Sequence, residues 1–229
     1  MKVNWRWLQI LLCKKEGSVS SSPFRLYECP ATRSDRVKFM LEELNIPYEL
    51  TTIQLAKGEH KTNEFLKINP YGAVPVLEDK NESLFLSESG AICEYIAFKH
   101  KDRLHYPTEN SKEYIQYKEL MYFGVSSLDP VSLTILHHSK SLAPENRSVY
   151  LLEDAIKKFT FCAQFLEKAL KDNKYVLGNK ISTPDFIIAT TLLWVKEEVV
   201  KYPILQNYID HILKLPSMVK VRNDVKNRL

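Results

Sequence analysis

The chain has 229 residues, of which 45% are hydrophobic and 26% charged, a composition typical of a globular protein with one large domain or two smaller ones. Its formal net charge is only +4, with basic residues spread among acidic ones, so the charge does not favour a nucleic-acid partner. Cys13, Cys29, Cys93 and Cys162 form no Cys/His cluster, which argues against a metal site and a disulfide framework, and no apolar run reaches the ~20 residues that would make a membrane span.

Residues 1–22 precede the first regular apolar pattern and combine basic residues with a short apolar stretch at 7–13. Gln9 interrupts this stretch and no small-x-small cleavage motif follows it directly, which disfavours a secretion signal, whereas the serines at 18–22 keep that alternative open. We interpret residues 1–22 as an N-terminal extension and expect a cytoplasmic protein, in keeping with the scattered cysteines.

Residues 24–55 carry strand, helix and strand signals in turn. Short strands are indicated at 24–29 and 48–55, and between them Val37, Met40 and Leu41 share one face of a predicted helix at 34–44. Two strands joined by a helix form a βαβ unit, in which the strands are parallel and the crossover is right-handed.

The next segment predicts two more strands and two helices. A polar turn at 78–83 separates two short apolar runs, which is typical of a hairpin. Pro75 has no amide hydrogen for a sheet ladder, so it belongs at the beginning of its strand. We expect a helix at 64–68, strands at 74–77 and 84–86, and a helix at 89–99. With the preceding unit, they give a thioredoxin-like βαβ-ββα domain at 23–100.

Residues 101–110 are polar and contain a proline, which indicates a linker, and residues 111–229 show only helical signals. The best-marked helix begins after Ser182, with Pro184 in its first turn and Asp185 completing a capping box. The predicted fold class is therefore an α/β thioredoxin-like domain followed by an all-α helical-bundle domain.

Three segments, in this order, resemble the cytosolic glutathione transferases: "INPYGAVPVLED" at 68–79, "LFLSESGAICEYI" at 84–96 and "YVLGNKISTPDFIIA" at 175–189. The likeness is to bacterial and fungal members, with a phi-class feature in "GEHK" at 58–61. It implies glutathione as co-substrate, no metal, a small hydrophobic electrophile as second substrate, and a homodimer without nucleic-acid or membrane partners.

The resemblance also implies a set of glutathione contacts. The peptide bond between Val74 and Pro75 would be cis and would present the backbone of Val74 to the cysteinyl part of glutathione. Ser89 would hold the γ-glutamyl carboxylate at a helix N-terminus, which favours anions, and Glu88 would face the γ-glutamyl amino group. The alternative is that Ser89 only caps its helix.

The phi-like pattern aims two further residues, His60 and Lys61, at the glycyl carboxylate of glutathione. The alternative for this pair is a solvated charge pair on the surface.

The residue that activates the glutathione sulfur is left open among three candidates. A free thiol with a pKa near ~8.5 is mostly protonated at neutral pH, so a donor must stabilise the thiolate. Thr32 stands about where serine-type members keep their hydroxyl, although Thr32 and Asp35 also have capping-box spacing. Ser34 offers a second hydroxyl in the same loop.

Cys29 is the third candidate, because Cys29-Pro30 resembles the start of the glutaredoxin and omega-type motif. A cysteine there would form a mixed disulfide with glutathione and make the protein a thiol transferase or reductase.

The predicted function is activation of the glutathione thiol for attack on a hydrophobic electrophile or a peroxide, in a detoxifying transferase. The alternatives are the Cys29-dependent thiol transferase and a non-catalytic, transferase-like adaptor protein. Aromatic and apolar residues at 114–128 would face the electrophile or fill the core, and we assign no pocket role to any of them.

Overall fold

The structure is a computed structural model that describes residues 22–228, so the predicted N-terminal extension lies outside the described residues apart from Ser22. Its first half contains a four-stranded sheet of order β2-β1-β3-β4, with β1 parallel to β2 and β3 antiparallel to both of its neighbours. The elements are β1 (Phe24–Glu28), α1 (Ser34–Glu43), β2 (Tyr48–Thr52), α2 (Asn63–Ile68), β3 (Val76–Asp79), β4 (Leu84–Ser87) and α3 (Ser89–Lys99). This is the predicted βαβ-ββα order of a thioredoxin-like fold.

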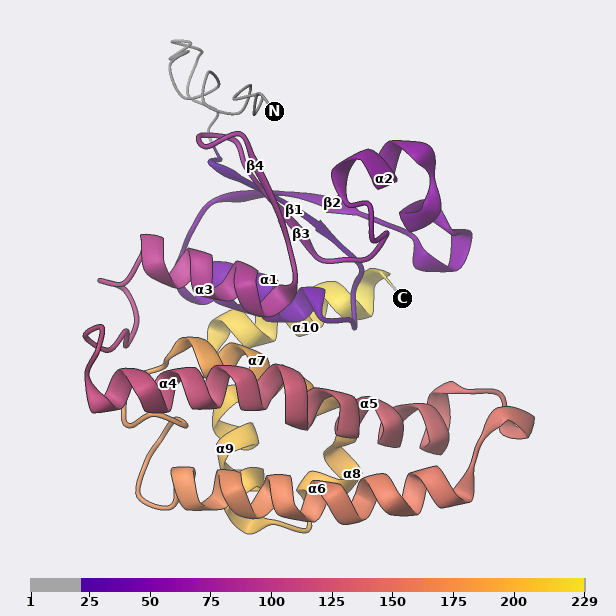
Figure 1. Cartoon of the computed structure of the whole chain (residues 1–229), viewed down its shortest axis with the longest axis vertical. Coiled ribbons are helices and arrows are strands. Elements are labelled where there is room, and N and C mark those ends of the chain that lie inside the picture. The colour runs from indigo at the N-terminus through magenta and orange to yellow at the C-terminus, as the bar shows by residue number, and fades with distance from the viewer. Residues whose placement is uncertain (1–21, 229) are drawn as a thin grey trace, which may run out of the picture.

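The two faces of the sheet are covered by different helices, as Figure 1 shows: α1 and α3 lie against one face and α2 lies by the other. Successive side chains of a strand point to opposite faces. Leu26 therefore joins the large core that contains residues of α1 and α3, whereas its neighbour Tyr27 packs with Phe65 of α2.

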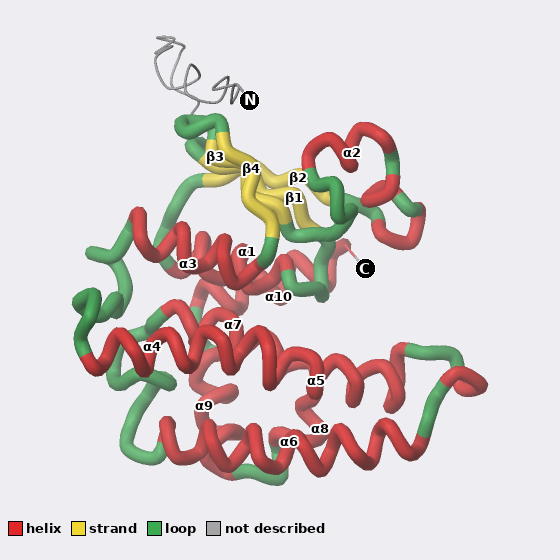
Figure 2. The backbone as a smooth tube through the Cα atoms, in the orientation of Figure 1, coloured by secondary structure: helices red, strands yellow, loops and turns green. Residues whose placement is uncertain are grey.

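The second half is helical throughout the described residues 112–228, apart from its connecting loops (Figure 2). A π-helical turn, Phe123–Leu128, joins the first two helices of this half. The helices are α4 (Lys112–Tyr122), α5 (Asp129–Leu136), α6 (Val149–Leu170), α7 (Thr183–Leu192), α8 (Lys196–Val199), α9 (Pro203–Ile212) and α10 (Pro216–Arg228). No helix of residues 22–228 is long and apolar enough to cross a membrane.

Helices α7 and α10 both make contacts with the first half. Every residue of α7 is buried, and the ring of Phe186 in α7 lies edge-on to that of Phe39 in α1, with centroids 4.8 Å apart. The last helix, α10, returns to lie along α1, where Lys220 pairs with Glu42 at 2.6 Å. The contacts between the halves are thus both apolar and charged, and they fix the position of α1.

The third strand begins later than the sequence predicts. The prediction placed it at 74–77, whereas β3 runs Val76–Asp79 and pairs Val76 with Tyr27 on one side and Ser87 on the other. Pro75 cannot donate to either ladder, so pairing starts only at the next residue.

The capping box of α7 connects this helix to its surroundings. The carboxylate of Asp185 is fully buried and accepts hydrogen bonds from the amides of Ser182 at 2.9 Å and Val176 at 3.0 Å, and from the hydroxyls of Ser182 at 2.8 Å and Tyr208 at 3.0 Å. Four donors therefore depend on one side chain.

We expect Asp185→Ala to lower the free energy of unfolding by about 3 kcal/mol, because buried donors would lose their acceptor. Urea denaturation measures this change. Asp210→Ala is the matched control, since this exposed aspartate accepts one hydrogen bond, from Gln206, and its loss should change stability by less than about 0.5 kcal/mol. Equal losses in the two variants would contradict the prediction.

Candidate functional site

Two adjoining cavities lie at the end of the sheet where α1 begins. The larger, of about 520 Å³, is bounded by Glu88 and Ser89 at the start of α3 and by Met121 and Tyr122 at the end of α4. The smaller, of about 400 Å³, is lined by residues of the loops before and after α2 and by Thr32. Both cavities are lined by Arg33, Tyr71, Ala73 and Val74.

The loop that carries Val74 is held by its own side chains and by a glycine. The side-chain amide of Asn69 donates to the carbonyl of Ala73 at 2.8 Å, and its oxygen accepts the amide of Tyr71 at 3.1 Å. Gly72 has a φ of +65°, and a Cβ there would lie 2.8 Å from the carbonyl oxygen of His60. The peptide bond between Val74 and Pro75 is cis.

The start of α3 supplies polar groups to the larger cavity. Glu88 occupies the N-cap position with a φ of +69°, and Ser89 is the first residue of the helix. The Ser89 hydroxyl accepts a hydrogen bond from Nη1 of Arg36 at 3.0 Å, which leaves its own proton for donation. The first amides of a helix also lack helical acceptors, so this corner of the cavity suits an anionic oxygen.

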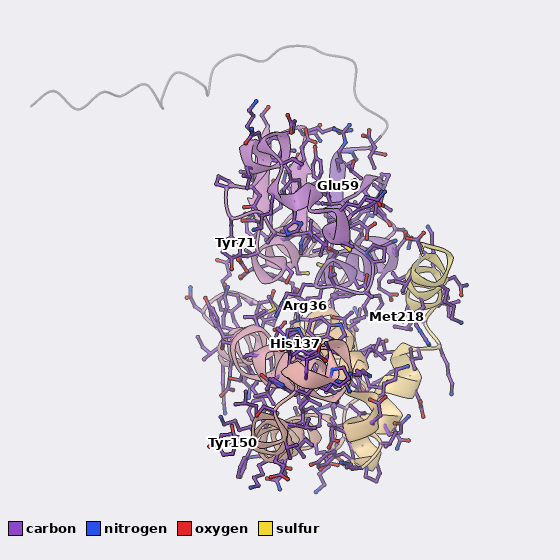
Figure 3. The ribbon with its side chains drawn as sticks, turned by 90° about the vertical axis from the view of Figure 1, so that its right-hand side faces the viewer. Arg36, Glu59, Tyr71, His137, Tyr150 and Met218 are labelled. Carbon is purple, nitrogen blue, oxygen red and sulfur yellow. The ribbon has the colours of Figure 1, made fainter. Side chains whose placement is uncertain are left out.

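The position of Ser89 depends on Arg36, whose side chain is only 2% exposed. Arg36 also donates to the carboxylate of Asp129 and to the hydroxyl of Thr191 at 2.8 Å. Burial lowers the pKa of Arg36, and Asp129 opposes this shift. Figure 3 shows Arg36 at the junction between the two halves.

Asp129 also holds a second arginine. Nε of Arg33 donates to its carboxylate at 2.9 Å, and Nη2 pairs with the other oxygen. The guanidinium carbons of Arg33 and Arg36 both lie 5.5 Å from the ring centroid of Trp194. One buried carboxylate and one indole therefore fix two cations at the base of the site.

The three candidates for activating the sulfur lie together in the loop before α1. The hydroxyl of Thr32 donates to the carbonyl of Cys29 at 2.7 Å and lies 3.0 Å from that of Ser34, which accepts the amide of Cys29 at 3.2 Å. Both hydroxyls thus bind within the loop. The N-cap position of α1 is Arg33, with no side-chain cap, so the alternative of a Thr32-Asp35 capping box is not found in this helix.

Only Thr32 of these three candidates lines either of the two cavities in the described chain. Ser34 is fully buried. Burial raises the pKa of the Cys29 thiol, the backbone of Leu55 opposes this shift, and the charges of Glu28 and Asp35 add to it. A raised pKa disfavours the thiolate that a nucleophilic cysteine requires.

His60 and Lys61 both line the smaller cavity, at its far end from Ser89. Lys61 donates to the carbonyls of Tyr71 at 3.2 Å and Gly72 at 2.9 Å, so it also braces the loop before Val74. Nδ1 of His60 is buried without a hydrogen-bond partner among residues 22–228.

The sequence reasoning missed Arg33, Arg36 and Asp129. A signal for Arg36 exists, because it lies four residues before Met40 and so shares the apolar face of α1. In the aromatic segment, Met121 and Tyr122 line the larger cavity, whereas Tyr117 and Leu128 are fully buried.

Family models agree with the fold and cover most of the described chain. The model of the glutathione S-transferase N-terminal domain matches residues 22–98, and that of the C-terminal domain matches residues 132–216. The glutathione S-transferase F13 of Arabidopsis thaliana is 30% identical over 154 residues, which are 66% of this chain and 69% of that protein. The chain therefore belongs to the glutathione S-transferase family of enzymes.

Other relatives match different shares of the chain. The glutathione S-transferase F4 of Arabidopsis thaliana is 47% identical over 93 residues, which are 39% of this chain and only 37% of that protein. The disulfide-bond oxidoreductase YfcG of Escherichia coli is 27% identical over 204 residues, which are 84% of this chain and 91% of that protein.

Two solved structures of glutathione transferases from Phanerochaete chrysosporium superpose on nearly the whole described chain. URE2P6, in complex with oxidized glutathione, is 25% identical, with a TM-score of 0.80 over 90% of this chain and 98% of that one. URE2P8, with oxidized glutathione, has a TM-score of 0.82 over 92% of this chain and 98% of that one, and at 21% identity it shows the fold alone.

The ionisation of Asp35, in the first turn of α1, makes the free energy of unfolding depend on pH. Burial and the charge of Glu28 raise its pKa to about 7, against the opposing charge of Lys38. A carboxyl with a higher pKa in the folded than in the unfolded state binds its proton more tightly when folded. Its contribution to stability is therefore largest at low pH and falls as pH rises from about 4 to about 7.

We expect Asp35→Asn, relative to wild type, to raise the free energy of unfolding by about 2 kcal/mol more at pH 8 than at pH 5. Urea denaturation of both proteins at the two pH values measures this difference. Contributions from other titrating groups cancel because the two proteins share them. Asp172→Asn, at an exposed position, is the control and should show no such difference. The same effect of Asp35→Asn at both pH values would show that Asp35 does not titrate in this range.

Proposed function

We propose that the chain binds glutathione along the two adjoining cavities and activates its thiol for attack on a hydrophobic electrophile or a peroxide. The observation that carries this proposal is the backbone of Val74 at the junction of the cavities, with the Ser89 hydroxyl held by Arg36 at one end. The tripeptide would lie extended between them.

The charges of the site complement those of glutathione. The γ-glutamyl carboxylate would accept from the Ser89 hydroxyl and the first amides of α3, and the neighbouring ammonium would face Glu88. At the other end, the glycyl carboxylate would lie by His60 and Lys61. The cysteinyl residue would pair with the backbone of Val74, as an added strand pairs with a sheet edge.

The electrophile would lie against the apolar wall formed by Met121, Tyr122 and Val125 in the larger cavity. This wall belongs to the helical half, and the opposite wall belongs to the thioredoxin-like half. Conjugation to a chlorinated aromatic compound and reduction of an organic hydroperoxide would distinguish the two kinds of substrate.

We expect wild-type protein to bind glutathione in isothermal titration calorimetry and Glu88→Gln to bind it about tenfold more weakly, because the ligand ammonium would lose a carboxylate partner. Glu82→Gln is the matched control, since Glu82 is exposed and pairs with Lys99 outside the site. Absence of binding by wild type would contradict the proposal and favour the non-catalytic adaptor.

A second candidate is glutathione-dependent disulfide reduction, which the similarity to YfcG favours. If Cys29 carried this activity, its thiol would have to be reactive and reach the ligand. Its raised pKa and its position outside the two cavities argue against that role.

We therefore expect Cys29→Ala to retain, within about twofold, any reduction of glutathione mixed disulfides that wild type performs, since a half-buried thiol of raised pKa is a poor nucleophile. A coupled assay with glutathione reductase measures the rate. Loss of this activity, together with a glutathione adduct on Cys29 in mass spectrometry of wild type, would establish the Cys29-dependent mechanism instead.

We also propose, from the family, that the chain forms a homodimer. Sedimentation velocity tests this assembly.

A further inference from the structure

We propose that Arg33 is a catalytic residue whose guanidinium, rather than a hydroxyl of the preceding loop, stabilises the thiolate of bound glutathione. This inference rests on the proposed function, because it requires glutathione in the two cavities. It assigns the activating group, for which the sequence offered Thr32, Cys29 and Ser34.

Arg33 lies in the region where the two cavities meet. A cysteinyl residue paired with Val74 would direct its sulfur into the region that both cavities share. The side chains around that region are those of Arg33, Tyr71, Ala73 and Val74. Arg33 is the cation among them, and the Tyr71 side chain is largely in solvent, since that residue is 77% exposed.

Arg33 is held in a fixed orientation before any ligand binds. Two of its nitrogens, Nε and Nη2, bind the carboxylate of Asp129, and its guanidinium carbon lies 5.5 Å from the ring centroid of Trp194. Among residues 22–228 the Arg33 side chain donates through Nε and Nη2, so Nη1 remains for a ligand. A fixed donor next to a developing charge needs no rearrangement during the reaction.

The charges around Arg33 leave an excess of positive charge at the base of the site. Arg33 and Arg36 share the single carboxylate of Asp129. On α3, Glu94 is paired with Lys118, and Glu88 lies at the γ-glutamyl end.

The remaining charged groups near the site do not reverse this excess. In the smaller cavity, His60 and Lys61 add further nitrogen donors. Asp35, in the first turn of α1, is half-buried near Glu28 and lines a separate cavity beside α10. The nearby cation should therefore favour the thiolate over the thiol.

The hydroxyls of the loop are engaged elsewhere. A threonine hydroxyl has one proton, and two loop oxygens lie within hydrogen-bond distance of that of Thr32, the carbonyl of Cys29 at 2.7 Å and the hydroxyl of Ser34 at 3.0 Å. Ser34 lies beneath the loop, fully buried. Arg33 is the donor that remains in the shared region.

The reaction step is a nucleophilic substitution by the thiolate, as in the uncatalysed reaction. The thiol proton of glutathione passes to water, and the sulfur lone pair forms a bond to the electrophilic carbon while the leaving group departs with the electron pair of its own bond. Arg33 keeps its protons throughout, and it lowers the pKa of the bound thiol.

The pKa of bound glutathione can be measured from the ultraviolet absorbance of its thiolate during a pH titration. We expect Arg33→Gln to raise this pKa by about one unit, to lower kcat/KM for a chlorinated aromatic about tenfold at pH 7, and to regain activity at higher pH. Arg33→Lys should give an intermediate pKa, because it keeps the charge without the bidentate grip on Asp129.

Thr32→Val and Tyr71→Phe are the matched variants and should leave the pKa of the bound thiol unchanged. A normal thiol pKa in Arg33→Gln, or a raised one in Thr32→Val, would overturn the role of Arg33. Binding of S-methylglutathione, which has no thiol, to the wild type tests the proposed glutathione site independently of the role of Arg33. If wild type does not bind this analogue, the proposed function itself fails.

Discussion

The interaction on which the site depends is that of the buried carboxylate of Asp129 with two arginines, Arg33 at the N-cap position of α1 and Arg36 within this helix. Asp129 belongs to α5 in the helical half, whereas Arg33 and Arg36 belong to the thioredoxin-like half. Removing one member of such a group leaves a buried charge without its partner, which is strongly unfavourable. The two halves are therefore joined by charge at the place where the cavities meet.

This interaction also links the helical half to the start of α3. Arg36 contacts Asp129, Thr191 and the Ser89 hydroxyl with one guanidinium. Any shift of α5 or α7 relative to α1 would change the orientation of Ser89. The helical half thus supplies an apolar wall of the larger cavity and also supports the thioredoxin-like half.

Much of the fold could be predicted because its signals are local. The apolar period at Val37, Met40 and Leu41 indicates α1, and the capping box of Ser182 and Asp185 marks the start of α7. The start of β3 was misplaced because an apolar run does not show where ladder pairing begins. Pro75 lacks the amide proton that pairing requires, and the strand starts after it.

The candidate site was predictable only where motifs are contiguous, as at Val74, Pro75, Glu88 and Ser89. The pair of Arg36 and Asp129 is separated by 93 residues, so no local pattern connects its members. The sequence around Thr32 is compatible with a sulfur donor and, as an alternative, with a helix cap. In the structure its hydroxyl lies 2.7 Å from the carbonyl of Cys29, a loop contact that the sequence does not indicate.

The most direct test is a crystal structure of this chain with glutathione bound. The account predicts the cysteinyl backbone paired with Val74, the γ-glutamyl carboxylate at Ser89, and the sulfur within about 3.5 Å of the Arg33 guanidinium. A sulfur bonded to Cys29, or one that accepts a hydrogen bond from Thr32 with Arg33 turned away, would contradict it.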